Sequence, residues 1–153
     1  MLATEDPLPT MRAISLDEIG GREQLQVTTR TIPDAEEGQV VVRNHFAGVN
    51  YMDIYLRTGH YPSPGGYPLI LGQEGVGTVV KLAGANPFQF RLGDRVVWLG
   101  SAGYAEYTVV NQGQVVRVPE GVSDEDAVAS HLAGMTALSL AEEHIQSERA
   151  TPS

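Results

Sequence analysis

Apolar and polar positions alternate in short runs along residues 11–120, and turn-forming residues separate the runs. The runs are rich in valine, isoleucine and threonine, whereas glycine, proline or asparagine stands between them. This pattern predicts β-strands. We place the strands within residues 11–20, 25–33, 40–50, 69–84, 90–100 and 104–120. Short strands spaced by turns favour a barrel over a sheet built from βαβ units.

Two segments have helical spacing instead. Residues 51–59, "YMDIYLRTG", predict one or two helical turns that end at a glycine. Residues 123–148 predict a longer helical region, with Ser123 as its N-cap and three acidic residues in its first turn. We expect Gly134 to divide this region into two helices, because glycine is a poor helix former.

The pattern therefore predicts a mainly β fold with short helices, of the α+β class, arranged as a barrel. The expected parts are a flexible lead over residues 1–10, a barrel domain over residues 11–122, a helical segment over residues 123–147 and a polar tail over residues 148–153. Seventeen glycines and nine prolines in 153 residues fit a fold with many turns.

The composition excludes several classes of protein. The formal net charge is −9, which repels nucleic acid and anionic membrane surfaces. No apolar run approaches the roughly 18 residues of a membrane span, and the first residues lack the pattern of a secretion signal. The absence of cysteine excludes disulfides and thiolate chemistry. We therefore expect a cytoplasmic protein that binds neither nucleic acid nor a membrane.

The stretch "LILGQEGVGTVV" at residues 69–80 has three closely spaced glycines, Gly72, Gly75 and Gly77. A dinucleotide-binding loop needs such glycines between a strand and a helix. Here a β-branched, strand-like segment follows the glycines, so the helix is missing. We therefore expect the glycines to serve a bent strand that approaches its neighbours closely.

Metal binding and nucleophilic catalysis find little support in the sequence. The histidines at positions 45, 60, 131 and 144 have no spacing typical of metal ligands. A zinc site needs three or four converging donors, so we expect no metal. No serine stands in a nucleophile elbow.

Aromatic and polar residues gather in the segment between positions 50 and 74. They are Asn50, Tyr51, Asp53, Tyr55, Tyr61, Tyr67 and Glu74. A cleft lined by rings with hydroxyl groups and an amide suits a flat, partly polar small molecule. A tyrosine-rich packing loop is the alternative. Asp53 and Glu74 would serve as general acid or base if buried, but such carboxylates more often anchor backbone N–H groups.

Four motifs follow one another along residues 47–143. They are "AGVNYMDIYLRTGHYP", "GQEGVG", "GDRVVWLGSAGYAEYTVV" and "AVASHLAGMTALSLAEE". In this order they resemble the medium-chain dehydrogenase/reductase superfamily, in its zinc-independent quinone oxidoreductase (zeta-crystallin-like) branch. The resemblance spans about residues 11–145. It implies a GroES-like β-barrel as the catalytic domain and a separate Rossmann domain for NADPH.

The resemblance also implies roles for single residues. Asn50, Tyr55 and Thr136 match residues near the nicotinamide, and Tyr61 matches a residue that borders the substrate cleft. Zinc-dependent relatives carry cysteine and histidine at the positions of Asn50 and Gln73, so the resemblance implies that catalytic zinc is absent. The catalytic candidates are thus Asn50, Tyr55, Glu74 and Asp53, and the candidates for the substrate cleft are Tyr61, Tyr51 and Tyr67.

In the family, a strand and a glycine-rich turn that holds the pyrophosphate follow the helix, and this sequence ends before them. We therefore expect the Rossmann domain to be absent from this chain and NADPH to bind poorly to the chain alone. The helical region would then expose Val128, Leu132, Met135, Leu138 and Leu140. A homodimer, or other self-association through these helices, would cover them.

Three hypotheses about function remain open at this point. The first is the catalytic-domain part of an enzyme that uses NADPH to reduce quinones or activated double bonds. The second is a stand-alone enzyme that works without cofactor and catalyses an isomerisation, cyclisation or elimination in the same cleft. The third is a non-catalytic binding module that pairs with a full-length relative.

Overall fold

The computed structural model describes residues 9–63 and 65–150, and its fold is mainly β, as the sequence predicts. The strands are β1 (Thr10–Leu16), β2 (Gln26–Thr31), β3 (Gln39–Ala47), β4 (Leu69–Ile70), β5 (Glu74–Leu82), β6 (Arg95–Leu99), β7 (Tyr107–Asn111) and β8 (Val115–Arg117). The α-helices are α1 (Tyr51–Arg57) and α2 (Asp124–Ala150), and short 3-10 turns cover Arg22–Gln24 and Gln112–Gln114. Most of the predicted lead and the end of the predicted tail lie outside the described residues.

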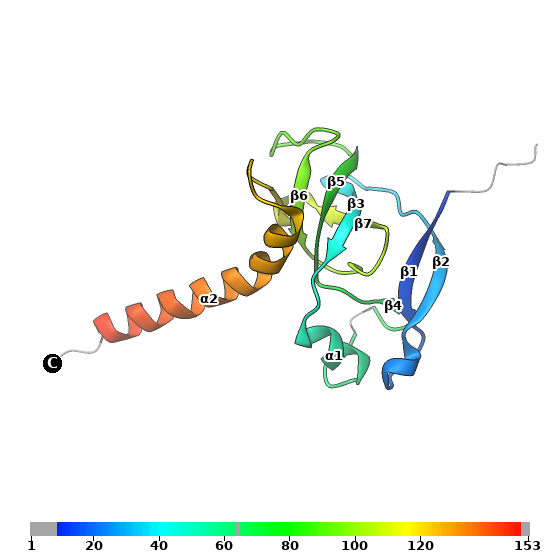
Figure 1. Ribbon diagram of the computed structural model, residues 1–153, viewed down its shortest axis with the longest axis horizontal. Coiled ribbons are helices and arrows are strands. Elements are labelled where there is room, and N and C mark those ends of the chain that lie inside the picture. Colours follow the sequence, from blue (N-terminus) through cyan, green and yellow to red (C-terminus); the bar gives the residue numbers. More distant parts are fainter. Residues whose placement is uncertain (1–8, 64, 151–153) are drawn as a thin grey trace, which may run out of the picture.

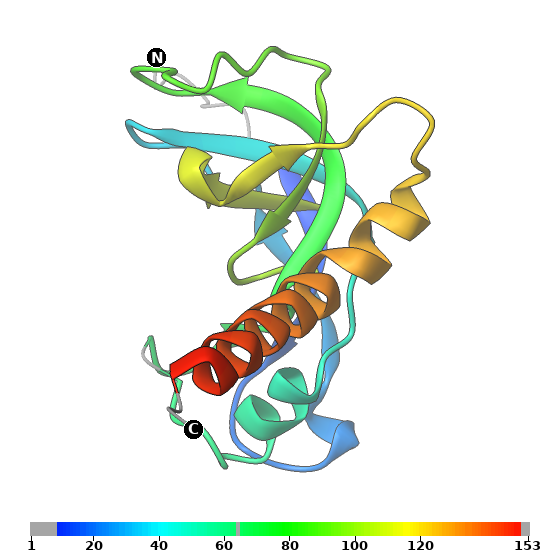
Figure 2. The same cartoon turned by 90° about the vertical axis from the view of Figure 1, so that its left-hand side faces the viewer.

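The strands form two antiparallel sheets that pack side by side (Figures 1 and 2). The five-stranded sheet has the order β7-β3-β5-β6-β8, and the three-stranded sheet has the order β2-β1-β4. Backbone hydrogen bonds join the sheets where β1 meets the segment before β7. The N–H of Ile14 donates to the Tyr104 carbonyl at 2.8 Å, and the N–H of Glu106 donates to the Arg12 carbonyl at 3.1 Å.

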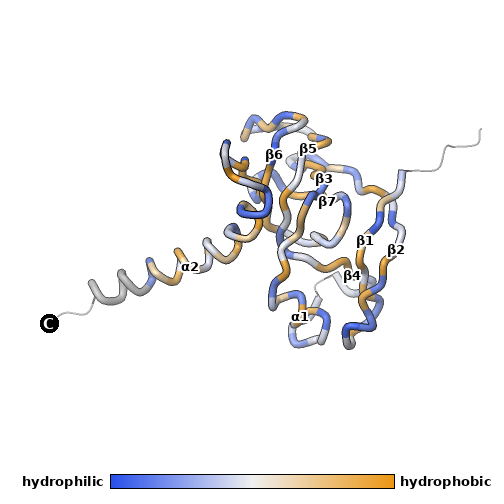
Figure 3. The backbone as a smooth tube through the Cα atoms, in the orientation of Figure 1, coloured by the Kyte–Doolittle hydropathy of each residue, from blue (hydrophilic) through white to orange (hydrophobic). Residues whose placement is uncertain are grey.

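The main core is formed by side chains from the strands of the larger sheet. It consists mostly of β-branched residues packed around one tryptophan. Apolar stretches concentrate in the strands, and several connecting loops are polar (Figure 3). Trp98 is fully buried among residues that include Val40, Val42 and Val96. Its indole N–H donates to the Asn44 side-chain oxygen at 3.0 Å, which satisfies the polar atom that burial would otherwise leave unpaired.

The segment predicted as one strand over residues 69–84 is two strands in different sheets. Leu69–Ile70 pairs with β1, whereas Glu74–Leu82 pairs with β3 and β6. Gly72 lies between them with a φ of +98°, a conformation that a residue with a side chain rarely adopts. The prediction of a single strand was wrong because apolar character alone does not reveal a change of sheet.

Helix α2 is continuous, so the prediction that Gly134 divides it was wrong. A glycine in a helix costs about 1 kcal/mol, and the surrounding alanine, leucine, methionine and glutamate residues are strong helix formers that offset this. The predicted N-cap is confirmed, because the Ser123 hydroxyl accepts the N–H of Asp126 at 3.0 Å. The helix runs on to Ala150, past the start of the predicted tail.

Only the first turns of α2 pack on the barrel, and the rest projects away from it (Figure 1). Val128 is buried together with Ala127 against residues of β5 and β6, so the expectation that it would be exposed was wrong. Further along, Met135 is 49% exposed and Leu138 is 66% exposed. The projecting part of the helix therefore presents apolar side chains to its surroundings.

Candidate functional site

Asp53 is the buried carboxylate of α1, and three donors converge on it. Its Oδ2 accepts the N–H of Asn50 at 2.9 Å and the hydroxyl of Tyr104 at 2.8 Å. Its Oδ1 accepts the N–H of Gly72 at 3.0 Å. Asp53 is 5% exposed, so these bonds tie α1 to the loop between β4 and β5 and to the loop before β7. This geometry favours the anchoring interpretation of Asp53 over a role as acid or base.

Tyr104 belongs to the same arrangement and was not among the residues picked out from the sequence. Burial raises the pKa of the Tyr104 hydroxyl well above its ordinary value, and the hydrogen bond to Asp53 raises it further. The hydroxyl therefore stays protonated and acts as a donor. Only the fold brings it to Asp53, since 51 positions separate the two residues.

Glu74 begins β5 and is the second buried carboxylate, with 5% exposure. Its Oε1 accepts the side-chain amide of Asn50 at 2.9 Å, and its Oε2 accepts the N–H of Leu132 in α2 at 3.1 Å. Gly48 leaves room for it, because a Cβ at that position would lie 2.2 Å from Oε1. Glu74 thus orients the Asn50 amide and holds α2 against the barrel.

His131 lies next to Leu132 on α2 and close to Glu74. Burial lowers the pKa of its imidazole below the ordinary value, although the nearby Glu74 carboxylate raises it in part. The lowered pKa favours the neutral form of His131. It was not a candidate from sequence, because a lone histidine on a helix carries no distinguishing pattern.

The tyrosines of α1 and the loop after it form an exposed aromatic group. The rings of Tyr55 and Tyr61 meet edge to face with centroids 5.4 Å apart. The ring centroids of Tyr51 and Tyr55 lie 6.4 Å apart. Tyr55 is 38% exposed and Tyr61 is 47% exposed, so both rings remain available to a ligand.

A cleft of about 610 Å³ opens beside this aromatic group. It is lined by Met52, Leu56, Tyr61, Pro62, Ser63, Gly65, Leu69, Ile70, Gln73 and Ser101. Of the three tyrosines predicted to line a substrate cleft, Tyr61 lines this one, and its role stays a prediction. Tyr51, Tyr55 and Tyr67 do not line this cleft, and the Tyr67 hydroxyl instead reaches the Leu56 carbonyl at 3.5 Å. Gln73 and Ser101 line the cleft but were not among the predicted site residues.

Thr136 lies apart from these residues, on the exposed side of α2. Its hydroxyl donates to the Leu132 carbonyl at 2.8 Å, one helical turn earlier. This bond connects Thr136 to Asn50 through Leu132 and Glu74.

Metal and membrane features can be assessed for the residues that the structure describes. Within residues 9–63 and 65–150, no three side chains of histidine, cysteine, aspartate or glutamate lie together as metal ligands would. Among the helices of this part of the chain, none combines the length and apolar character needed to cross a membrane.

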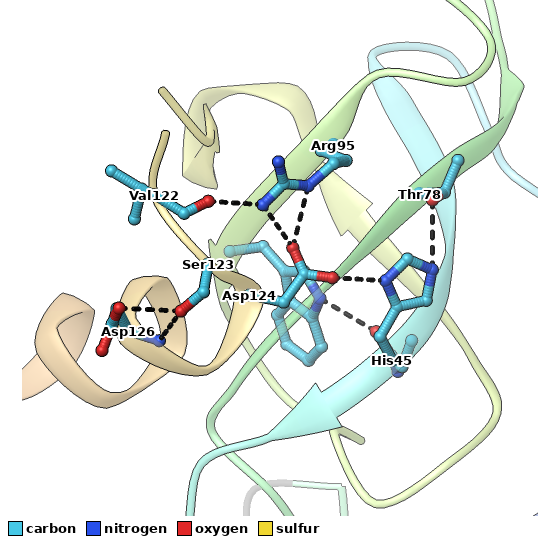
Figure 4. A network of polar contacts seen from close by, with 9 residues as sticks. His45, Thr78, Arg95, Val122, Ser123, Asp124 and Asp126 are labelled. Atoms are coloured by element: carbon cyan, nitrogen blue, oxygen red, sulfur yellow. Dashed lines mark hydrogen bonds and ion pairs between the residues drawn. The ribbon is translucent and has the colours of Figure 1, made fainter. Parts of the chain in front are cut away.

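The first turn of α2 is fixed to the barrel by a polar network (Figure 4). Asp124 accepts the Arg95 guanidinium through Oδ1 at 2.8 Å and meets the His45 ring through Oδ2 at 2.7 Å. The other nitrogen of His45 lies 3.1 Å from the Thr78 hydroxyl. We call Asp124, Arg95 and His45 the latch. It sets the position of the helix whose Leu132 N–H reaches Glu74.

The latch predicts a pH-dependent contribution to stability. Burial alone would raise the pKa of Asp124, but the hydrogen bonds from His45 and Arg95 outweigh it and hold the pKa below its ordinary value. A lowered folded-state pKa stabilises the fold above the ordinary aspartate value of about 3.9, and this contribution is lost as pH falls below it. Asp124→Asn should therefore lower the free energy of unfolding at pH 7 by about 1 kcal/mol.

Urea denaturation from pH 7 to pH 3 would test this prediction. The difference between the variant and the wild type should shrink as the pH falls. Glu125→Gln is the matched control, because Glu125 is an exposed acid in the same helical turn. A difference that stays constant down to pH 3 would contradict the assigned ionisation of Asp124.

Known proteins match this chain in both sequence and structure. The alcohol dehydrogenase GroES-like domain family matches residues 36–120. A "Probable quinone oxidoreductase" of Schizosaccharomyces pombe is 40% identical over 131 residues, which cover 85% of this chain and 39% of that protein. Quinone oxidoreductase 1 of Escherichia coli is 36% identical over 125 residues, which cover 80% of this chain and 38% of that protein. The chain thus spans about two-fifths of the length of these relatives.

Solved structures agree with this result. The quinone oxidoreductase of Escherichia coli complexed with NADPH superposes with a TM-score of 0.79 at 35% identity, covering 86% of this chain and 40% of that one. The quinone oxidoreductase from Coxiella burnetii gives a TM-score of 0.83 at 25% identity, covering 88% of this chain and 45% of that one. The fold, the family match and these relatives together show that the chain belongs to the medium-chain dehydrogenase/reductase family and is a GroES-like domain of its quinone oxidoreductase branch.

Proposed function

We propose that this chain forms the substrate-binding half of a reductase site for quinones or activated double bonds, with NADPH held mainly by a separate domain. The observation that carries this proposal is the apolar cleft beside the Asn50–Glu74 pair. Gln73, which lines the cleft, directly precedes Glu74 in the sequence. Glu74, which holds the Asn50 amide, does not itself line the cleft, so the cleft and the amide are connected through these two consecutive residues at the start of β5.

The cleft suits a flat molecule of one or two rings. Its volume of about 610 Å³ falls within the range of ligand pockets in proteins. Met52, Leu56, Leu69 and Ile70 provide apolar walls, and Tyr61 adds an aromatic ring at the edge. Such walls favour a conjugated ring by burial and leave orientation to a few polar groups.

Among the residues that the structure describes, those around Asn50 and Tyr55 fit one end of NADPH, and no group suits the other end. The fixed amide of Asn50 and the exposed ring of Tyr55 suit the nicotinamide, which supplies a hydride equivalent when it is bound. The glycines of β5 do not suit the pyrophosphate. A Cβ at Gly75 would lie 2.6 Å from the Trp98 ring, and a Cβ at Gly77 would lie 2.1 Å from the Arg43 carbonyl oxygen. The space beside both glycines is therefore filled by the protein itself.

Within this half-site each group has a positioning role. Glu74 holds the Asn50 side chain in one orientation, and the Asp53 anchor holds the start of α1 on which Asn50 stands. Tyr61 and the apolar walls place the ring of the substrate and exclude water from it. Hydride addition to a quinone gives a hydroquinone anion, and solvent can protonate its oxygen. Hydride addition to an activated double bond gives an enolate, and its α-carbon takes the proton from solvent.

The hydrogen bonds that Glu74 already accepts favour reduction over the alternative in which the chain acts as an enzyme without cofactor. Both of its carboxylate oxygens accept hydrogen bonds, one from Asn50 and one from Leu132. A general base for isomerisation or elimination needs an oxygen that can reach the substrate proton. Homodimer formation and pairing with a full-length relative through α2 stay predictions.

A titration monitored by NMR would test the proposed function. We expect 1,4-naphthoquinone to shift the backbone signals of Met52, Tyr61 and Gln73. Tyr61→Ala should raise its Kd about two- to tenfold, the range for loss of one aromatic contact. Phe88→Ala is the control, because Phe88 is 49% exposed but does not line the cleft.

The same samples would test whether NADPH is held mainly by a separate domain. NADPH fluorescence should change little at micromolar protein concentration. Naphthoquinone shifts confined to another surface would exclude the cleft as the binding site. Micromolar NADPH affinity of this chain would contradict the assignment of the cofactor to a separate domain.

A further inference from the structure

The polar side chains inside the cleft are few, and their hydrogen bonds distinguish them. The Ser63 hydroxyl already has a hydrogen-bond partner, because it donates to the Gly66 carbonyl at 3.1 Å. Within the part of the chain that the structure describes, the side chains of Gln73, Ser101 and Tyr61 make no hydrogen bond, although all three line the cleft. Tyr61 lies in the loop after α1, whereas Gln73 and Ser101 lie at the paired ends of β5 and β6. Polar groups left free among apolar walls are the groups available to a ligand.

Backbone pairing brings Gln73 and Ser101 to the same place. Glu74 pairs with Leu99 across β5 and β6, and the N–H of Gly100 donates to the Gln73 carbonyl at 2.9 Å. Gln73 thus directly precedes one paired strand, and Ser101 shortly follows the other. Because side chains alternate along an extended chain, Gln73 faces the cleft while its neighbour Glu74 reaches Asn50 and α2.

The chemistry of this pair matches one ligand group. A glutamine amide offers two N–H donors, and a serine hydroxyl offers one O–H donor. A carbonyl oxygen has two lone pairs and accepts two such bonds at once. Met52, Leu56, Leu69 and Ile70 suit the conjugated ring that would carry the carbonyl.

We propose that Gln73 and Ser101 are the specificity-determining pair of this cleft, and that together they hydrogen-bond a carbonyl oxygen of a conjugated cyclic ketone or quinone. This inference rests on the proposed function, since it assigns two residues to the same cleft. It goes further by making the carbonyl, rather than the flat ring alone, the feature that the protein recognises.

Two ligands with the same ring system separate the carbonyl from the ring. We would titrate the chain with 1,4-naphthoquinone and with 1,4-dihydronaphthalene, which lacks both oxygens, and follow the cleft signals by NMR. The absence of cysteine removes the thiols with which quinones react most readily. The wild type should bind the quinone about tenfold or more tightly than the hydrocarbon, as two hydrogen bonds to one ligand allow.

Variants of Gln73 and Ser101 then show which side chain causes the difference in affinity between the quinone and the hydrocarbon. Gln73→Leu keeps a similar shape without the amide, and Ser101→Ala removes an exposed hydroxyl with little risk to folding. Each should weaken quinone binding about two- to tenfold and leave hydrocarbon binding within twofold. Gln73→Glu should weaken quinone binding at least as much, because a carboxylate repels a carbonyl oxygen. Gln114→Leu is the matched control, because Gln114 is exposed and outside the cleft.

The other outcomes would overturn either the assignment of Gln73 and Ser101 or the proposed function. If the variants weaken both ligands equally or weaken neither, the pair does not recognise a carbonyl. If the wild type binds both ligands equally well in the cleft, the assignment of the pair fails and the proposed function survives. If neither ligand binds the wild type, the proposed function fails as well.

Discussion

Replacing Asp53 by alanine should lower the free energy of unfolding by about 3–5 kcal/mol, since one buried and two partly buried donors would lose their acceptor together. Those donors are the N–H of Asn50, the N–H of Gly72 and the hydroxyl of Tyr104. Asp53 is 5% exposed, so water cannot readily replace the lost acceptor. The melting temperature should fall by roughly 10 °C.

Two further variants would confirm the cause. Asp17→Ala removes an exposed aspartate and should leave stability within about 0.5 kcal/mol of the wild type. Tyr104→Phe removes one donor and should cost less than Asp53→Ala. If Asp53→Ala melted within 2 °C of the wild type, Asp53 would not be the anchor of α1. A catalytic role for Asp53 would then deserve a kinetic test.

Replacing Gly77 by alanine should destabilise the fold by about 2–4 kcal/mol, because the new methyl group has no space. A Cβ at this position would lie 2.1 Å from the carbonyl oxygen of Arg43 on the neighbouring strand. Gly77 pairs with Asn44 on one side and with Val96 on the other, so β5 cannot move away without losing pairing in the centre of the sheet. Urea denaturation would measure the loss.

The control for this substitution is the same change in open space. No atom lies within 4 Å of a Cβ placed on Gly134 in α2, outside its own helix. Gly134→Ala should therefore stabilise the protein by about 0.5–1 kcal/mol, as alanine does in a helix. Equal effects of the two substitutions would show that the close approach of β3 and β5 is not what requires glycine at position 77.

Residues of similar appearance in the sequence have different roles in the fold. Asp53 and Glu74 are both buried acids, yet the first holds backbone and a tyrosine hydroxyl, and the second orients a side-chain amide. Tyr61 lines the cleft, whereas Tyr67 reaches the carbonyl of Leu56. Neither difference shows in the local sequence, because it depends on where distant segments of the chain lie.

The sequence by itself determined the class of the fold, most of the strands, the helix after Asn50, the N-cap at Ser123 and the family. These features follow from local rules: alternation of apolar residues, turn residues between strands, a capping residue before a helix, and motifs in a fixed order. The tertiary structure alone decided that α2 is continuous, that Val128 is buried, and that Gln73 and Ser101 meet in one cleft. Those features depend on contacts between strands and helices far apart in the chain, and local patterns carry no information about which surfaces meet.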